Sequence, residues 1–264
     1  MSIVYRNRGQ ERRAFIEMVF EELQVQKEVT GKHILIKPNI VSYEPYPTTT
    51  HPETLAICLR LLSDFSKRVT VADGPAWDAG DSKSMIERHP LKQTCDEFGV
   101  TLVDLLSKGT KKVKTRSFEL DVAQLAFECD FILSLPVLKS HMLGLTGALK
   151  NHVGFLSSEE KLRSHRVRDM SQVIAELHEV FKPRLYVVDA VQTLIKTNEV
   201  RHGGQPTKLG YMLAGTDPVS LDVAGLELLK EVESKLVGKQ YEDISQIRHA
   251  VTLGIGEAQY EVIE

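Results

Sequence analysis

Apolar positions recur along the chain with two different spacings, and the two spacings alternate. In Glu11–Gln26 and Val167–Phe181, apolar residues return every three or four positions, which predicts amphipathic helices. Short apolar runs between such segments predict buried strands. These runs are His33–Ile36, Arg68–Ala72, Val100–Val103, Phe131–Leu133, Leu185–Val188 and Tyr211–Ala214. The alternation predicts an α/β fold, with a parallel or mixed sheet and helices on both faces.

Polar residues mark the starts of several expected helices. Thr50 and Glu53 predict a capping box, and Ser157 and Glu160 predict a second one. Asp217 is followed by a proline and predicts an N-cap, because proline fits the first turn of a helix. The three signals support the helical segments that follow them.

Three segments are expected to lie outside the main pattern. Lys108–Phe118 predicts a charged hairpin, Val122–Phe127 a short helix and Gln192–Lys208 a polar loop. The five basic residues of the hairpin form either a phosphate-facing patch or, more typically, the solvated edge of a sheet. No linker or repeat divides the chain, so we expect a single α/β domain over residues 1–264 with the hairpin and the loop as insertions.

Composition and charge narrow the class of protein. The apolar fraction of 42% and the charged fraction of 26% are typical of a soluble globular protein. The formal net charge of -3 gives no bulk attraction to nucleic acid or to an anionic membrane. Apolar runs stay well short of the length that a membrane-spanning helix needs. We therefore expect neither nucleic acid nor a membrane as a partner.

The cysteines argue against a disulfide framework and against a bound cluster. Cys58, Cys95 and Cys129 are isolated, odd in number and never approach a CxxC spacing. Zinc ribbons and iron–sulfur clusters both need clustered thiolates. The chain is therefore expected to carry no iron–sulfur cluster and to hold reduced thiols in the cytoplasm.

Polar side chains follow the apolar run at the end of five of the six expected strands. The first strand leads to Lys37 and Asn39, the second to Asp73, the fourth to Lys139 and His141, and the last two to Asp189 and Asp217. In doubly wound α/β sheets, ligands bind just beyond the carboxyl ends of the strands. The pattern therefore predicts a shared crevice at one edge of the sheet.

The stretch Phe131–Gly154 concentrates this chemistry. Lys139 and His141 stand two positions apart, which places both side chains on one face of an extended segment. If Gly144–Asn151 forms a short helix, its first amides favour an anion. The functional interpretation is a pocket for a carboxylate or phosphate, with histidine as proton carrier. The alternative is a group of surface lysines beside a hydrogen-bonded histidine, and the spacing leaves both open.

A metal site is a further hypothesis. Enough candidate ligands are present, namely His141, His152, His165, Asp73 and Asp189, but no pair such as HExxH occurs. The sequence leaves room for a divalent ion without predicting its ligands. No GxGxxG, Walker A or GxSxG motif occurs, which disfavours nucleotide binding by these motifs and serine-hydrolase chemistry.

Several short motifs occur in an order that resembles a known family. They are Lys37-Pro38-Asn39, Asp73-Gly74-Pro75, the run from Leu135 to His141, Gly147–Asn151, Asp189-Ala190 and Ala214–Asp222. Together they resemble the family called "domain of unknown function 362", over nearly the whole chain. The resemblance implies a fold but no particular reaction. Many members carry an added ferredoxin-like domain, which implies redox work for them, and this chain lacks the clustered cysteines. The lysine–histidine and Gly-x-x-Lys pieces are also similar to the lactate racemase family, where such residues flank a nickel-pincer cofactor.

These observations lead to two functional hypotheses. In the first, a strand-end pocket binds a small anionic metabolite, with acid/base or metal-assisted chemistry, and whether the protein is an enzyme stays open. In the second, the protein is a non-catalytic binding or redox-adaptor protein that works with a separate iron–sulfur partner. In the first hypothesis the expected catalytic residues are His141, Lys139 and Asp189. The expected ligand-binding residues are Lys37, Asn39, Asp73, Lys150, Asn151 and Asp217.

Overall fold

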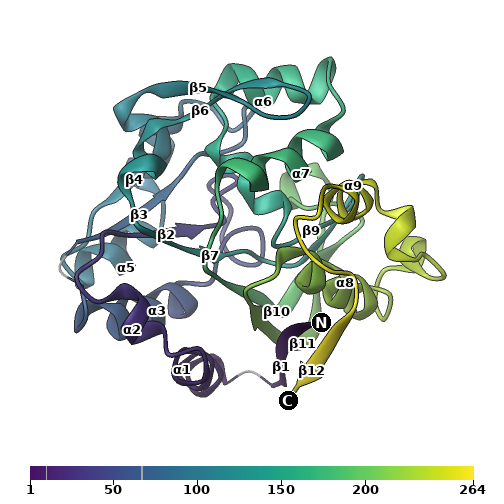
Figure 1. Cartoon of the computed structure of the whole chain (residues 1–264), viewed down its shortest axis with the longest axis horizontal. Helices are drawn as coiled ribbons and strands as arrows, with labels where there is room; N and C mark the ends of the chain where they lie inside the picture. The colour runs from purple at the N-terminus through teal and green to yellow at the C-terminus, as the bar shows by residue number, and fades with distance from the viewer. Residues whose placement is uncertain (10, 67) are drawn as a thin grey trace.

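One sheet carries most of the strands of the molecule (Figure 1). In the computed structural model, which describes residues 1–9, 11–66 and 68–264, this sheet has eight strands in the order β12-β1-β11-β10-β7-β2-β3-β4. In that order they are Tyr260–Ile263, Ser2–Arg8, Gln205–Gly215, Leu185–Ile195, Phe131–Leu135, Ile34–Pro38, Val69–Asp73 and Leu102–Asp104. Strands β1 and β12, at the two ends of the chain, pair with each other and were not expected from the sequence.

The sheet is mixed, and the direction of a single strand matters for the site. Strands β10, β7, β2, β3 and β4 pair in parallel, so their carboxyl ends lie at one edge. Strand β11 pairs antiparallel with both β10 and β1. Its carboxyl end therefore lies at the opposite edge. The expected α/β fold is confirmed, and of the two sheet types that the sequence left open, parallel or mixed, the structure has the mixed one.

Helices cover both faces of the sheet. In Figure 1, α1, α2 and α3 lie below the sheet, and α6, α7 and α9 lie above it. The helices are α1 Arg12–Glu22, α2 Val25–Val29, α3 Pro52–Ser63, α4 Ser82–Arg88, α5 Leu91–Glu97, α6 Ser158–Arg166, α7 Met170–Val180, α8 Pro218–Leu229 and α9 Ser245–Leu253. Among the residues described, no helix is long and apolar enough to cross a membrane.

The alternation of side chains along β2 explains the two layers. Ile34 and Ile36 pack into the core cluster that contains Phe15 of α1. Leu35, between them, packs on the other face with Leu177 of α7. Successive residues of a strand point to opposite faces, so a strand that is buried on both sides is apolar throughout.

Two predictions near the N-terminus need correction. The helix expected over Glu11–Gln26 is interrupted, because Gln24 adopts a left-handed conformation with φ 49° between α1 and α2. The expected capping box of Thr50 and Glu53 is wrong. The side chain of His51 caps α3 by accepting the Glu53 amide, while the Thr50 hydroxyl donates to Leu135 O at 2.7 Å.

The charged segment does form a hairpin. Strands β5 (Thr110–Lys114) and β6 (Glu119–Ala123) make a separate two-stranded antiparallel sheet. Three of its basic residues contact carboxylates, in the pairs Lys108–Glu128, Lys112–Glu119 and Arg116–Glu179. The helix expected over Val122–Phe127 is instead the end of β6 followed by a 3-10 turn, η2 (Gln124–Glu128).

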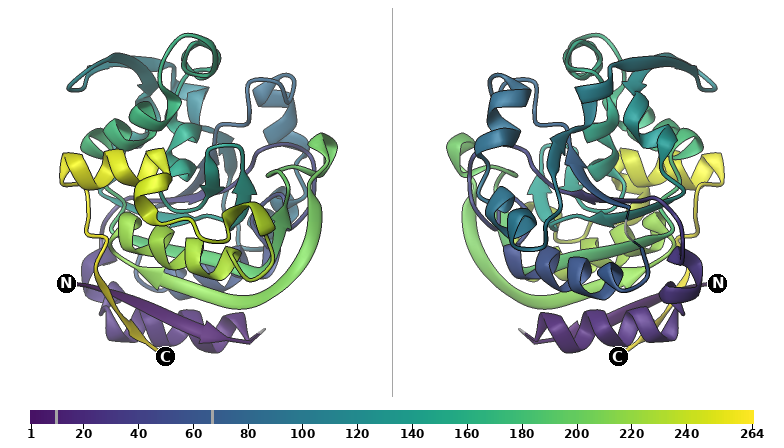
Figure 2. Two further views of the ribbon diagram at one scale, coloured as in Figure 1. Left: turned by 90° about the vertical axis from the view of Figure 1, so that its right-hand side faces the viewer. Right: turned by 90° about the vertical axis from the view of Figure 1, so that its left-hand side faces the viewer.

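The expected loop Gln192–Lys208 is largely strand. Strands β10 and β11 each extend to eleven residues and remain paired out to Ile195 and Gln205. The remaining connection carries a short 3-10 turn, η4 (Val200–His202). Figure 2 shows the light-green β11 curving along one side of the molecule. Much of this extension is exposed and therefore polar. The segment lacks the apolar run from which the other strands were predicted.

The stretch between β7 and α6 is also different from its prediction. Instead of a helix over Gly144–Asn151, strands β8 (Lys139–His141) and β9 (Gly144–Thr146) form an antiparallel hairpin. Gly144 has φ 106°, a conformation that glycine adopts readily and that the tight turn requires. A 3-10 segment, η3 (Lys150–Phe155), follows. Capping of α6 by Ser157 is confirmed, since its side chain accepts the Glu160 amide.

Candidate functional site

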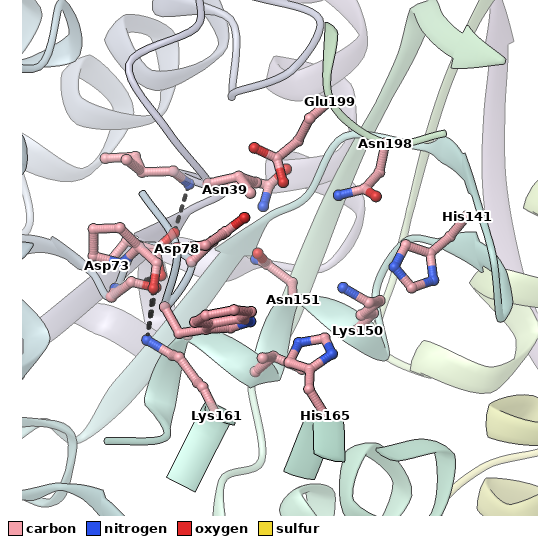
Figure 3. Close-up of a pocket in the computed structure, with 18 of the residues that line it drawn as sticks. Asn39, Asp73, Asp78, His141, Lys150, Asn151, Lys161, His165, Asn198 and Glu199 are labelled. Atoms are coloured by element: carbon pink, nitrogen blue, oxygen red, sulfur yellow. Dashed lines mark hydrogen bonds between the residues drawn. The ribbon is translucent and has the colours of Figure 1, made fainter. Parts of the chain in front are cut away.

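A cavity of about 300 Å³ opens at the carboxyl ends of β2 and β3 (Figure 3). Its other walls come from the β8–β9 turn, η3, α6 and the connection between β10 and β11. This is the edge where the parallel strands end, as the ligand-site rule for α/β sheets predicts. Six of the expected site residues line it, namely Lys37, Asn39, Asp73, His141, Lys150 and Asn151.

Lys37 and Asp73 form a buried ion pair at the bottom of the cavity. Lys37 Nζ lies 2.7 Å from Asp73 Oδ1, and it also donates to Asn151 Oδ1 at 3.1 Å. Asp73 accepts two backbone amides as well, from Ile40 at 2.6 Å and Gly74 at 2.8 Å. Burial lowers the pKa of Lys37, and the Asp73 carboxylate opposes that shift. The pair is therefore neutral as a unit and leaves no free charge for a ligand.

Two glycines allow the walls of the cavity to approach this pair. A Cβ at Gly154 would lie 2.2 Å from Asp73 Oδ1 and 2.8 Å from Lys37 Nζ. A Cβ at Gly74 would lie 2.3 Å from the carbonyl oxygen of Gly154. All three distances are shorter than real Cβ contacts, so the present packing of η3 on the end of β3 depends on glycine at both positions.

Lys150 carries the uncompensated charge of the site. Among the described residues, no hydrogen bond or ion pair engages its ammonium, and Figure 3 shows it beside His141 and His165. Burial lowers the pKa of Lys150 to about 8, and Glu199 partly opposes the shift. At neutral pH the group is thus largely charged, but a proton can leave it at modest cost.

Lys161 is a second lysine of the cavity, and the sequence did not indicate it. It extends from α6 and is buried, and its Nζ donates to the carbonyl oxygens of Gly74 at 3.1 Å and Pro75 at 2.9 Å. Burial lowers the pKa of Lys161 to about 8. Its charge interacts most strongly with Asp73, which Lys37 already neutralises.

His141 faces the cavity as a hydrogen-bond donor. Its Nδ1 accepts the backbone amide of Leu143 at 3.0 Å. A neutral imidazole that accepts at Nδ1 carries its proton on Nε2. Burial and the nearby Lys150 ammonium hold the pKa of His141 well below its usual value, so the ring is neutral at pH 7.

Lys139 lies next to the cavity, in a smaller compartment of about 40 Å³ that also touches Lys150 and Asn151. Its Nζ donates to Asn39 Oδ1 at 2.7 Å and to Thr48 O at 2.5 Å. Burial lowers the pKa of Lys139 to about 7. The prediction that Lys139 belongs to the site is thus compatible with its position, although the main cavity does not include it.

Asp189 does not reach the cavity, contrary to its expected place in the site. Its backbone is near β8, but its carboxylate turns toward the opposite layer. There it accepts from Arg12 Nε at 2.8 Å, the Tyr46 hydroxyl at 2.6 Å and the Thr54 hydroxyl at 3.2 Å. These contacts tie α1, α3 and the loop between β2 and α3 to the sheet.

Asp217 is also remote from the other expected residues, because it follows β11, which runs antiparallel to its neighbours β10 and β1. It caps α8 by accepting the amides of Val219 at 2.8 Å and Ser220 at 3.1 Å. Its second oxygen accepts from the Ser2 hydroxyl and the Glu257 amide. The N-cap prediction is confirmed, and the expectation that Asp217 shares the crevice is wrong.

The sequence suggested that the backbone amides at the start of Gly144–Asn151 would bind an anionic ligand. In the structure, the side chain of Asp222 binds the amides near Gly147 instead. Asp222 accepts the amide of Ala148 at 2.6 Å and that of Leu149 at 3.3 Å. Burial raises the pKa of Asp222 to about 7. A Cβ at Gly147 would lie 2.2 Å from Asp222 Oδ1, so this contact also requires a glycine.

The described residues do not provide the set of protein ligands that a metal site would need. Across residues 1–9, 11–66 and 68–264, no group of three His, Cys, Asp or Glu side chains could hold an ion. His152, one of the expected ligands, is buried in the core and stacks on His178 with ring centroids 3.5 Å apart. The cysteines Cys58, Cys95 and Cys129 are free thiols. A separate iron–sulfur partner stays a prediction.

The fold is similar to that of a known enzyme. The lactate racemase apoprotein from Thermoanaerobacterium thermosaccharolyticum superposes with a TM-score of 0.57 at 15% sequence identity. The match covers 88% of this chain and 58% of the racemase, so the chain spans less than two thirds of the length of that protein. At this identity the similarity shows a shared fold alone.

Comparisons of sequence agree with the resemblance found in the motifs. None of the curated proteins matches the chain. A family model does match it, over residues 34–227, which include all the strands and turns that line the cavity. The chain therefore belongs to the domain of unknown function family DUF362.

Proposed function

We propose that the cavity binds a small anionic metabolite through a carboxylate or phosphate group. The observation that carries this proposal is the state of Lys150, an amine that faces the cavity without an acidic partner among the described residues. A partly buried ammonium is costly unless an opposite charge or hydrogen bonds stabilise it. A bound anion would supply that stabilisation.

The charges around the cavity support the same conclusion. Asp73 is neutralised by Lys37. Asp78 and Glu199 both contact Arg201, at 2.8 Å and 2.7 Å. Asp78 and Glu199 thus share one guanidinium and keep one negative charge between them, whereas Lys150 and Lys161 add two positive charges that form no ion pair among the described residues. The cavity as a whole favours a negative ligand.

Proton transfer is the chemistry that these residues suit best. With a pKa of about 8, Lys150 can both lose and regain a proton near neutral pH. His141 would donate a hydrogen bond from Nε2 to the ligand, and in this tautomer it does not accept a proton at Nε2. The proposal therefore gives the role of proton carrier to Lys150 and that of orienting donor to His141.

A carboxylate is the more favoured head group. The structural neighbour is named as a racemase of lactate, itself a small carboxylate. We extend that substrate class, and only that, to this chain. Among the described residues, no three His, Cys, Asp or Glu side chains converge to hold a metal ion, so the proposed proton transfer depends on Lys150 and His141. The three free thiols suit the reducing cytoplasm as the expected location.

Calorimetric titration of the purified protein with sodium acetate, sodium lactate and inorganic phosphate tests the proposal. Methylammonium chloride serves as the cationic control. We expect at least one anion to bind and the cation not to bind. The substitution Lys150→Gln should lower the affinity for the anion by about tenfold. Lys239→Gln, an exposed lysine outside the cavity lining, should leave binding unchanged. Failure of all three anions to bind at tens of millimolar would reject the proposal.

A further inference from the structure

The cavity changes character between its mouth and its floor. Lys37, Asp73 and Lys161 at the floor are each no more than 2% exposed. Trp77 and Met142, which line the same cavity, are 41% and 84% exposed. Large apolar side chains at the rim of a charged cavity mark a place where an apolar part of a ligand can be covered.

Trp77 is held in position although its ring is exposed. On one side, the Ala76 amide donates to Val41 O at 3.0 Å. On the other, the Arg201 guanidinium donates to the backbone and side-chain oxygens of Asp78, at 3.0 Å and 2.8 Å. A tryptophan with a fixed backbone loses little entropy when a ligand packs against it, which favours binding.

The surroundings of the indole are suited to a flat, electron-rich or anionic partner. The Arg166 guanidinium lies over the ring, 5.7 Å from its centroid, and the His165 ring lies 6.4 Å away at 51°. Aromatic rings pack on one another in offset or tilted arrangements at these distances. A planar group that enters the cavity would contact the Trp77 indole, with the Arg166 guanidinium and the His165 ring beside it.

We infer that the ligand of this cavity has two parts, an anionic head and a planar aromatic body that packs against Trp77. The inference rests on the proposed function and adds the class of the ligand's body to it. The head would lie near Lys150, and the body would cover the apolar rim that Trp77 and Met142 expose.

A matched series of four small probes separates the two parts. Benzoate carries both the charge and the planar ring, cyclohexanecarboxylate keeps the charge and the size without planarity, benzamide keeps the ring without the charge, and acetate keeps only the head. Trp77 is the single tryptophan of the sequence, so its fluorescence reports directly on this site. Calorimetry gives the affinities independently.

We expect benzoate to quench the Trp77 emission and to bind about threefold to tenfold tighter than cyclohexanecarboxylate, with acetate and benzamide weaker still. In Trp77→Leu, the ratio between benzoate and cyclohexanecarboxylate should fall to about one. Phe127→Leu is the control, since Phe127 is a similarly exposed aromatic residue outside the cavity lining, and it should keep the ratio.

Two outcomes would overturn the inference, and they differ from failure of the proposed function. Equal binding of benzoate and cyclohexanecarboxylate would exclude a planar body. A ratio that persists in Trp77→Leu would exclude Trp77 as the surface that selects it. If none of the carboxylates binds at tens of millimolar while inorganic phosphate does, the inference is rejected and the proposed function stands. If phosphate also fails to bind, the proposed function is rejected as well.

Discussion

The ammonium of Lys37 lies 2.7 Å from the carboxylate of Asp73, and both side chains are almost completely buried. The two residues belong to adjacent parallel strands, β2 and β3. Asp73 also accepts the backbone amides of Ile40 and Gly74. The pair therefore holds in place the segments that follow β2 and β3. The floor of the cavity therefore depends on this contact.

Removing one member of the pair should destabilise the protein strongly. In Lys37→Met, the Asp73 carboxylate would stay buried without its cation, and the free energy of unfolding should fall by about 3–5 kcal/mol. Urea denaturation measures the change. Lys92→Met is the matched control, because the Lys92–Asp96 pair is exposed, and it should cost less than about 1 kcal/mol. Equal losses in the two variants would contradict a special role for the buried pair.

A single methyl group at Gly154 should disturb the same place. The new Cβ of Gly154→Ala would lie 2.2 Å from Asp73 Oδ1, and relieving this overlap should cost about 1–3 kcal/mol and weaken anion binding. Thermal unfolding and calorimetry give the two readouts. In Gly99→Ala, the Cβ meets open space but φ is 65°, so a loss of about 1 kcal/mol from backbone strain is expected, with anion binding retained. A Gly154→Ala protein with native stability would show that the loop shifts freely.

The sequence predicted the floor of the site because parallel strands share an edge. Lys37 and Asp73 each follow an apolar run, and both runs proved to be parallel neighbours. Asp217 also follows an apolar run, yet the run is antiparallel, and no local pattern of residues reveals the direction of a strand. Asp189 was expected for the same reason as Asp73, but its side chain points to the other layer, toward Arg12.

The remaining site residues depend on tertiary contacts that spacing does not encode. Lys161 and His165 reach the cavity because α6 packs above the end of β3, 88 and 92 positions after Asp73 in the sequence. Trp77 lies in a turn whose position depends on Arg201, far along the chain. The buried face of α6 is unusually polar, with Glu160, Lys161 and Ser164 all buried, and that pattern was the one available signal.

Binding of a carboxylate should weaken at high pH. The charged forms of Lys150 and Lys161 favour the anion, and the pKa of each amine is about 8. The affinity for acetate should therefore be constant between about pH 6 and 7 and fall as the pH rises through 8, by up to about tenfold for each amine that loses its charge. Because a guanidinium stays charged, Lys150→Arg should show a shallower decline. An affinity that is constant up to about pH 10 in the native protein would contradict these pKa values.

The tautomer of His141 can be read directly. Because Nδ1 accepts the Leu143 amide, the proton should reside on Nε2, and the ring should stay neutral down to well below pH 6.5. Long-range ¹⁵N–¹H correlation spectra distinguish the two neutral tautomers and the imidazolium. His249, which is more exposed and lies 3.4 Å from the Asp169 carboxylate, provides an internal comparison. An imidazolium signal for His141 at pH 7 would contradict its assignment as a neutral donor.

Asp222 should make the stability of the protein depend on pH in an unusual direction. Burial raises the pKa of this carboxyl from 3.8 to about 7, so the folded protein binds the proton more tightly than the unfolded chain. Its contribution to stability is complete below about pH 4 and decreases as the pH rises through 7. Asp222→Asn keeps an oxygen that accepts the Ala148 amide but cannot ionise. The stability of the native protein relative to Asp222→Asn should therefore decrease by up to about 4 kcal/mol between pH 4 and pH 8. Urea denaturation of both proteins across this range measures the difference, and other titrating groups cancel between them. A difference that does not change with pH would mean that the two backbone amides keep the carboxylate ionised in the folded state.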